Sequence, residues 1–249
     1  MKQEIYALAF QEEDTHWWYA ARRRILVELV ARLARASGEP NRILDYGCGT
    51  GSILKAMQPL GEAYGIDMSG EAVQHCRQRG LDRVAHVPLE ELIRYENPFD
   101  RRFHIVTMLD VLEHIPGDVG ALRGIGEWIE PGGRVVIAVP AYEFLWSGED
   151  YVSEHVRRYT ASGLKRVVRE AGFHVERCTY FNAFLLPVQL AVVLAKRVFD
   201  PRSMYVSMVR PTSPIVNTVL RTVFESERFF LPWMRFPAGG SLVCIGVKR

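Results

Sequence analysis

Cysteine is scarce in this chain, and its spacing excludes two classes of small stabilised protein. Four Cys occur among the 249 residues, and no two of them form a C-x-x-C pair. Such spacing is unlike a disulfide framework or a zinc knuckle, and it fits a reducing compartment. The N-terminal stretch MKQEIYALAFQEED also lacks the basic start and apolar run of a signal peptide. We therefore expect a cytoplasmic protein.

The chain also carries little net charge and has no long uninterrupted hydrophobic run. The 31 Lys and Arg residues nearly balance the 29 Asp and Glu residues, so the formal net charge is +2. This balance gives no indication of a nucleic-acid partner. The longest apolar stretch, residues 180–195, is interrupted by Asn182, Pro187 and Gln189, whereas a bilayer-spanning helix needs about 20 apolar residues. A membrane-spanning segment is therefore not expected.

Strand-like and helix-like segments alternate through most of the chain. Apolar runs typical of buried strands lie at residues 42–46, 62–67, 83–87, 103–109, 134–140, 173–181 and 241–249. Because helical patterns separate these runs, we predict an α/β fold with a doubly wound, mainly parallel sheet. An amphipathic helix over residues 15–36 precedes the first strand, and Gly38 and Pro40 end it.

The predicted organisation is one core with two additions. Residues 1–40 form an N-terminal helical cap, and residues 41–181 together with 241–249 form the core. Residues 182–240 stand between two strands that a short hairpin could have joined, and they carry two helical patterns. Connections this long inside a compact domain are usually functional. We therefore expect this helical insertion to be a lid beside a ligand site.

Three glycines follow the first strand in the stretch ILDYGCGTGSI. Gly47, Gly49 and Gly51 open a helix, where they let the backbone touch a ligand and the helix N-terminus attracts an anionic group. Asp67 ends the second strand, and an acid in that place can accept both hydroxyls of a ribose. The combination predicts a site for a nucleoside with an anionic tail. A nicotinamide cofactor expects the spacing G-x-G-x-x-G, which would put the third glycine at Ser52.

The spacing found, G-x-G-x-G after ILD, resembles motif I of the class I S-adenosylmethionine-dependent methyltransferases. The stretches YGIDMS, FHIVTMLDVLEHI and IEPGGRVVIAVP are similar to the second-, fourth- and fifth-strand motifs of that family. The resemblance implies a Rossmann-like sheet of seven strands, with S-adenosylmethionine as cofactor and S-adenosylhomocysteine as product. The cofactor-binding residues that it implies are Asp45, Gly47, Cys48, Gly49, Gly51, Asp67, Met68, Leu89 and Leu109.

Within this resemblance the three glycines line the methionine half of the cofactor and Asp45 supports their loop. Asp67 would hold the ribose, and Met68 would pack on the adenine. DNA amino-methyltransferases of this class carry an Asn/Asp-Pro-Pro-aromatic stretch after the fourth strand, and cytosine-C5 enzymes carry a Pro-Cys pair. This chain has LDVL there, so DNA is not expected as a partner.

Acidic and imidazole side chains follow the fourth and fifth strands. Asp110, Glu113 and His114 lie in LDVLEH, and His155 lies in SEHVRRYT. This set is similar to the divalent-metal site of small-RNA 2′-O-methyltransferases and ubiquinone-biosynthesis O-methyltransferases, although Asp110 stands where those groups have Glu. In those enzymes the metal ion binds adjacent oxygens of the acceptor and lowers the pKa of the hydroxyl that receives the methyl group. Two alternatives stay open: His155 or His114 acts as a metal-free base, or LEH only ends the strand.

The flanking segments supply the remaining candidates. The candidate acceptor contacts are Trp17, Trp18, Arg22, Tyr142, Arg158 and Tyr159. The alternative for the N-terminal helix is that its aromatic side chains dock into the core, and the alternative for Arg158 and Tyr159 is a solvated basic turn. The apolar segment 182–199 is either a lid on the sheet edge or a cover for a lipid-like acceptor or a membrane surface. The expected function is methyl transfer to a hydroxyl of a small or lipid-like acceptor, with His155, His114 and Asp110 as catalytic residues. The alternatives are a nicotinamide-dependent oxidoreductase and a non-catalytic protein that binds S-adenosylmethionine.

Overall fold

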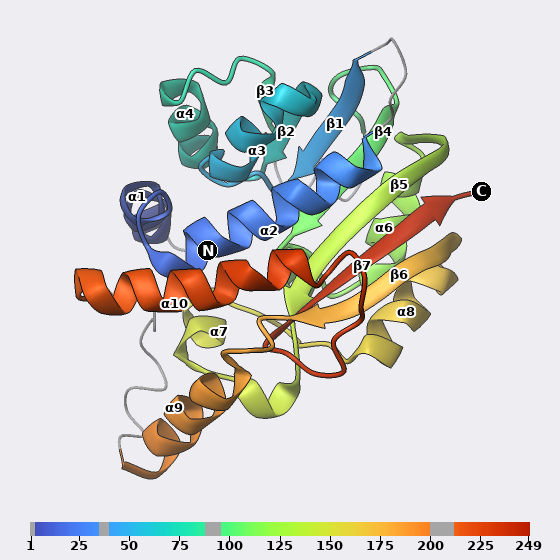
Figure 1. Ribbon diagram of the computed structural model, residues 1–249. Coiled ribbons are helices and arrows are strands. Elements are labelled where there is room, and N and C mark those ends of the chain that lie inside the picture. Colours follow the sequence, from blue (N-terminus) through green and yellow to red (C-terminus); the bar gives the residue numbers. More distant parts are fainter. Residues whose placement is uncertain (1–2, 35–39, 88–95, 200–211) are drawn as a thin grey trace.

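Seven strands form a mixed sheet in the computed structural model, which describes residues 3–34, 40–87, 96–199 and 212–249 (Figure 1). The strands are β1 (Asn41–Tyr46), β2 (Gly61–Asp67), β3 (Val84–His86), β4 (Phe103–Leu109), β5 (Ile129–Pro140), β6 (Phe173–Phe181) and β7 (Ser241–Lys248). Their order is β3-β2-β1-β4-β5-β7-β6, and β7 runs antiparallel to both of its neighbours. The predicted doubly wound, mainly parallel seven-stranded sheet is confirmed.

The order of the strands determines where a ligand can bind. β1 pairs with β2 on one side and with β4 on the other, so the winding of the chain reverses at β1. In open α/β sheets such a reversal opens a crevice at the carboxyl ends of the strands. Gly47 and Asp110 follow β1 and β4, and Asp67 is the last residue of β2, so the three residues converge on one edge of the sheet.

The middle of the sheet is buried on both faces. Residues 135–139 of β5 are all 0 % exposed, which explains their continuous run of small and β-branched apolar residues. β5 begins at Ile129 rather than at residue 134, and its pairing with β4 is irregular between Phe103 and Ile105. The extra residues of β5 thus extend the sheet at the end opposite to the glycine loop.

Helices cover both faces of the sheet. They are α1 (Gln3–Glu12), α2 (Trp17–Leu33), α3 (Ser52–Met57), α4 (Gly70–Gln78), α6 (Asp118–Gly126), α7 (Gly148–Val152), α8 (Ala161–Glu170), α9 (Leu186–Phe199) and α10 (Pro214–Ser226). Figure 1 shows α2 and α10 in front of the sheet, with α6 and α8 behind it. The core therefore lies in two layers, one on each side of the strands.

The N-terminal segment differs from its prediction. α2 begins at Trp17 rather than at Thr15, because the side chain of His16 accepts a hydrogen bond from the backbone N–H of Trp18 at 3.4 Å and caps the helix. The hydroxyl of Thr15 instead donates to the carbonyl of Glu12 at 3.5 Å. α1 has no counterpart among the predicted elements, and it lies beside α4. Its position brings the N-terminal segment close to the loop after β1.

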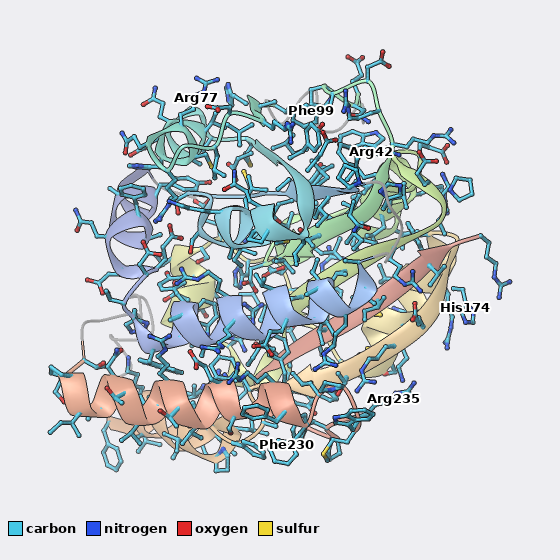
Figure 2. The ribbon with its side chains drawn as sticks, turned by 45° about the horizontal axis from the view of Figure 1, so that its top comes forward. Arg42, Arg77, Phe99, His174, Phe230 and Arg235 are labelled. Carbon is cyan, nitrogen blue, oxygen red and sulfur yellow. The ribbon has the colours of Figure 1, made fainter. Side chains whose placement is uncertain are left out.

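The segment between β6 and β7 carries α9 and α10. α10 lies along α2 and buries Phe224, whereas α9 projects away from the sheet with Val193 as its buried residue (Figure 1). The loop after α10 leaves Phe230 and Arg235 on the outside of the molecule (Figure 2). None of the helices in the described part of the chain combines the length and the apolar character needed to cross a membrane.

Candidate active site

The glycine loop after β1 adopts a backbone that glycine takes with little strain. Gly47, Gly49 and Gly51 have φ of +78°, +53° and +86°, in the left-handed region that other residues rarely enter. The backbone N–H groups of Gly47 and Cys48 donate to the carbonyl of Ile66 at 2.8 and 2.9 Å and anchor the loop. No described atom lies within 4 Å of the position that a Cβ on Gly49 would take. Gly49 thus borders open space, as a ligand-binding loop requires.

Asp67, at the end of β2, is bound to this loop. Its Oδ2 accepts from the backbone N–H of Gly49 and its Oδ1 from that of Ser69, both at 2.8 Å. Burial, followed by the charge of Asp67, raises the pKa of Tyr6, which lies beside this carboxylate on α1. Burial raises the pKa of Asp67 even though these backbone donors oppose the shift. Met68 follows on the surface and is 48 % exposed.

Asp45 is a buried acid on the wall of the same loop. It is 3 % exposed, and the hydroxyl of Thr107 on β4 donates to its Oδ1 at 2.6 Å. Burial raises the pKa of Asp45 to about 7, and the hydrogen bond from Thr107 only partly opposes this shift. A carboxyl group with such a pKa changes its charge near neutral pH, as groups at functional sites often do.

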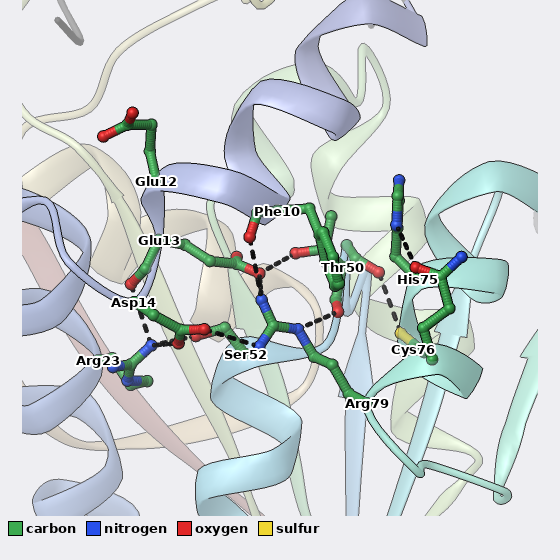
Figure 3. A network of polar contacts seen from close by, with 12 residues as sticks. Phe10, Glu12, Glu13, Asp14, Arg23, Thr50, Ser52, His75, Cys76 and Arg79 are labelled. Carbon is green, nitrogen blue, oxygen red and sulfur yellow. Dashed lines mark hydrogen bonds and ion pairs between the residues drawn. The ribbon is translucent and has the colours of Figure 1, made fainter. Parts of the chain in front are cut away.

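The turn between α1 and α2 is fastened to the glycine loop (Figure 3). The Glu13 carboxylate accepts from the hydroxyl of Thr50 and from Nη2 of Arg79, the latter at 2.5 Å. Nε of Arg79 donates to the carbonyl of Thr50 at 3.0 Å, and Arg23 donates to the hydroxyl of Ser52. Hydrogen bonds between charged groups are stronger than neutral ones. The N-terminal segment is therefore a wall of the site.

A cavity of about 550 Å³ extends from the glycine loop to α9 and α10, a volume typical of small-molecule sites. The predicted residues that line it are Trp17, Trp18, Arg22, Asp45, Gly47, Cys48, Gly49, Leu109, Asp110, His114, His155 and Arg158. Predicted residues outside its lining are Gly51, Asp67, Met68, Glu113, Tyr142 and Tyr159. Leu89 lies outside the described residues. Tyr6 and Glu13 also line the cavity, and no sequence motif had indicated them.

Glu113, His114 and His155 form a cluster that can bind a metal ion. One ligand atom from each lies within 4.8 Å of the other two, because the short 3-10 turn η2 (Leu112–His114) follows β4 at the edge where His155 also lies. Glu113 is 0 % exposed, and both of its carboxylate oxygens lack a hydrogen-bond partner in the described structure. Burial first, and then the charge of Asp110, raise the pKa of Glu113 well above its usual range. An unpaired buried carboxylate is costly, so the cluster fits a cation.

A buried ion pair orients His155. Nδ1 of His155 lies 2.8 Å from Oδ1 of Asp150, and its Nε2 lies 4.0 Å from Oε1 of Glu113. Arg158 also binds Asp150, through Nε and Nη2 at 2.7 Å each. Burial raises the pKa of Asp150, but the hydrogen bonds from His155 and Arg158 outweigh it and hold the net pKa well below the usual range. The ionised Asp150 therefore fixes the ring with Nε2 toward Glu113.

His114 completes the cluster as a neutral imidazole. Burial, followed by the charge of His155, lowers the pKa of His114 to about 4. The two imidazole rings meet edge to face, with their centroids 4.7 Å apart. The neutral form, which coordinates metal ions, is therefore the form of His114 at physiological pH.

Asp110 has a different partner from the one that the metal prediction gives it. Arg22 holds its carboxylate with two hydrogen bonds, from Nη2 to Oδ1 at 2.6 Å and from Nε to Oδ2 at 2.8 Å. Arg22 itself is 2 % exposed, and its guanidinium carbon lies 5.1 and 4.9 Å from the ring centroids of Trp18 and Phe181. Asp110 therefore lies outside the cluster around Glu113, and the guanidinium group of Arg22 binds a side chain of the protein itself.

Tyr142 and Tyr159 belong to the framework around the cavity. Tyr142 stacks on Phe144 and Tyr180, with ring centroids 4.9 and 5.0 Å apart. The buried hydroxyl of Tyr159 donates to Asp118 at 3.0 Å. The structure therefore places these two predicted acceptor contacts outside the lining of the cavity.

Comparison with known proteins gives the class of this chain. Residues 17–177 match a family model described as a methyltransferase domain. One curated relative, the ubiquinone biosynthesis O-methyltransferase of Alkalilimnicola ehrlichii, is 34 % identical over 152 residues. That match covers 53 % of this chain and 60 % of the relative, so the chain spans less than two thirds of the relative's length.

Solved structures share the fold at low sequence identity. A Haloferax volcanii methyltransferase, solved in complex with the Trm112 methyltransferase activator, has a TM-score of 0.59 at 20 % identity, with 98 % of this chain and 94 % of that chain covered. A methyltransferase from Archaeoglobus fulgidus, described as SAM dependent, has a TM-score of 0.57 at 19 % identity, with 91 % and 94 % covered. The chain belongs to the methyltransferase domain family, and its fold is that of the class I S-adenosylmethionine-dependent methyltransferases. This membership favours the methyltransferase prediction over a nicotinamide-dependent oxidoreductase.

Proposed function

We propose that the protein transfers a methyl group from S-adenosylmethionine to a hydroxyl group of a lipid-like acceptor. The observation that carries the proposal is that one cavity is lined by the glycine loop, by His114 and His155, and by apolar residues of α9. A cofactor, a group that activates a hydroxyl and an apolar acceptor body can thus share this space. The O-methyltransferase names of curated relatives support a hydroxyl as the target.

The residues present fit the cofactor. Gly47 and Gly49 would hold its amino-acid tail, and the open space beside Gly49 is what a bound tail needs. Asp67 would accept the ribose hydroxyls, and Tyr6 lies beside that carboxylate. Asp45, when ionised, would attract the amino group of the tail. When bound, S-adenosylmethionine supplies a methyl group activated by a positively charged sulfur.

The cluster of Glu113, His114 and His155 fits a divalent metal ion. One carboxylate and two imidazoles are a donor set that suits Mg, Mn or Zn. Glu113 contributes two oxygens without partners, and Asp150 supports His155 as outer carboxylates do at metal sites. A metal ion held there would lower the pKa of the acceptor hydroxyl. Asp110, paired with Arg22, would stay outside the ligand set.

The protein can also remove the acceptor proton with its own residues. Because the ionised Asp150 faces Nδ1 of His155 at 2.8 Å, the proton of the neutral ring lies on Nδ1, and Nε2 is free to accept a proton. This hydrogen bond favours a metal-free version of the same reaction, with His155 as general base. The two versions differ in whether Glu113 is required.

Apolar side chains on the insertion support a lipid-like acceptor. Val188 and Val192 of α9 and Leu220 of α10 line the cavity. The far end of α9 is also apolar, since Val198 and Phe199 are 69 % and 84 % exposed. Basic residues in its last turn add positive charge beside them. Apolar surface next to positive charge is typical of contact with an anionic membrane, and the proposal therefore includes peripheral membrane contact through residues 182–199.

Methylation assays on the purified protein test this proposal. Wild type and Glu113→Gln are supplied with S-adenosylmethionine and alkyl-substituted catechols, whose adjacent hydroxyls suit a metal ion. We expect wild type to form S-adenosylhomocysteine, and we expect Glu113→Gln or EDTA to lower the rate by about tenfold or more. Glu127→Gln is the matched control, because Glu127 is exposed.

The outcomes separate the versions of the reaction. Activity that is undiminished by both EDTA and Glu113→Gln would contradict the metal and leave His155 as the base. Tight binding of S-adenosylhomocysteine without turnover on any hydroxyl acceptor would contradict the hydroxyl target. Restoration of EDTA-treated wild type, but not of Glu113→Gln, by added Mg²⁺ or Mn²⁺ would support the metal version.

A further inference from the structure

Two side-chain amides interrupt the apolar wall of the cavity. Asn182, just after β6, and Gln189, in the first part of α9, both line the cavity. Asn182 is 4 % exposed. Oδ1 of Asn182 and Oε1 of Gln189 are buried and have no hydrogen-bond partner in the described structure. The reaction proposed above uses neither amide.

Hydrogen bonds to the backbone around Asn182 hold this residue in place. Asn182 has the left-handed φ of 56°, and its carbonyl accepts from the backbone N–H of Gly240 at 3.0 Å. The carboxylate of Glu227 accepts from the next two backbone N–H groups, those of Ala183 and Phe184, at 2.7 and 2.9 Å. Asn is one of the few residues other than Gly that tolerate this backbone. The conformation of Asn182 is therefore fixed by three hydrogen bonds.

Gly240 makes room for both side chains. A Cβ on Gly240 would lie 2.1 Å from Oε1 of Gln189 and 3.1 Å from Nδ2 of Asn182. Any larger residue at position 240 would therefore displace the amide of Gln189. The two amides and the glycine come from the residue after β6, from α9 and from the residue before β7, and they meet at one place on the wall.

We propose that Asn182 and Gln189 form a specificity site for the acceptor. When a ligand binds, a rotation of each side chain would let its unpaired carbonyl oxygen accept a hydrogen bond from a hydroxyl or N–H group that the acceptor carries apart from the hydroxyl that is methylated. The inference rests on the proposed function, since it assigns the contents of the same cavity. A buried amide oxygen without a hydrogen bond is unfavourable, so a ligand that donates a hydrogen bond to it is preferred over a ligand that cannot.

The chemistry of the wall narrows the acceptor further. Val188 and Val192 lie on the same helix as Gln189 and also line the cavity. An acceptor that satisfies this wall is amphiphilic, with an apolar body and a second polar group that donates a hydrogen bond. A wholly apolar chain would leave both amide oxygens unpaired.

A matched pair of acceptors tests the specificity site. Two alkyl catechols are compared that are identical except for one ring substituent, hydroxymethyl in one and the similarly sized ethyl group in the other. We expect wild type to have a KM about tenfold lower for the hydroxymethyl compound. Gln189→Met keeps the length of the side chain and removes its polar atoms, so it should abolish this preference while kcat changes little. Gln74→Met, on an exposed face of α4, is the control.

A second measurement does not depend on turnover. Without ligand, Gln189→Met should melt at the same temperature as wild type or higher, because it removes an unpaired buried oxygen. A lower melting temperature would overturn the proposal, since it would mean that the amide has a structural partner. Equal KM values of wild type for the two catechols, or an unchanged ratio in Gln189→Met, would also overturn it.

The assays give a different pattern of results if the proposed function, methylation of a hydroxyl group, is wrong. If neither catechol is methylated, the proposed hydroxyl acceptor is wrong, and the specificity site is then judged on binding by calorimetry with S-adenosylhomocysteine present. Tighter binding of the hydroxymethyl compound to wild type than to Gln189→Met supports the site. Equal binding, or no binding of either compound, overturns it.

Discussion

Replacing Asp45 by Asn should stabilise the protein at neutral pH. Asp45 is 3 % exposed, the hydroxyl of Thr107 donates to it at 2.6 Å, and burial raises its pKa from 3.8 to about 7. Asn has nearly the same shape and can still accept from Thr107, but it is neutral at every pH. The substitution therefore removes an ionisation and leaves the packing almost unchanged.

The size of the effect follows from the linkage between protonation and unfolding. A carboxyl group with a raised pKa binds more protons in the folded protein than in the unfolded chain. Its contribution to the free energy of unfolding is intact below pH 3.8 and is lost as the pH rises through about 7. Each pH unit in this window corresponds to about 1.4 kcal/mol. Wild type should therefore lose about 4 kcal/mol relative to Asp45→Asn across the window.

Urea unfolding from about pH 4 to about pH 8 measures this difference. The free energies of unfolding of wild type and Asp45→Asn should be similar at the acid end and should diverge as the pH rises, with the variant more stable. Asp82→Asn is the control, because Asp82 is exposed and its substitution should give a curve parallel to wild type. If the curve of Asp45→Asn also runs parallel to wild type, the reasoning from burial is refuted.

Three further substitutions test other parts of the site. Gly49→Ala should weaken the binding of S-adenosylhomocysteine, measured by calorimetry, about tenfold, because the added Cβ enters the space for the ligand. Gly80→Ala is the control, since Gly80 has φ of +79° and equally open surroundings, and it should leave the affinity unchanged. Equal affinities of the two variants would place the ligand elsewhere. Arg22→Met should lower the free energy of unfolding in urea by about 2 kcal/mol, because it leaves the partly exposed Asp110 unpaired; an unchanged value would contradict this. Phe199→Asp should reduce co-sedimentation with anionic vesicles, and undiminished sedimentation would count against membrane contact.

The sheet and the glycine loop could be predicted because they depend on short-range patterns. Apolar runs mark the strands, and the spacing of Gly47, Gly49 and Gly51 needs only the strand before it and the helix after it. The meeting of Glu113 and His155 was also within reach, since the two residues follow β4 and β5, which are neighbouring parallel strands.

Contacts between distant segments could not be predicted in this way. Arg22 and Asp110 are 88 residues apart, and nothing in either neighbourhood indicates that they form a pair. Glu13 reaches Thr50 only because α1 folds back over the glycine loop.

Asp150 is different, because the stretch SGED contains the Ser-x-x-acid pattern of a helix N-terminus, and this capping box is present in the structure. That pattern could have revealed α7 and the acid that orients the imidazole of His155.

Glu113 differs from the neighbouring acids Asp110 and Asp150 in its partners. Arg22 neutralises Asp110, and Arg158 neutralises Asp150. Glu113 has two imidazoles beside it, but its carboxylate has no hydrogen-bond partner in the described part of the chain. A protein with a neutral, well-packed residue at position 113 would usually be at least as stable. The fold therefore does not require the carboxyl group of Glu113. Burial raises the pKa of Glu113 well above its usual range, so its carboxyl group stays neutral unless a cation approaches it. A metal ion bound by the cluster, as proposed above, would lower this pKa again.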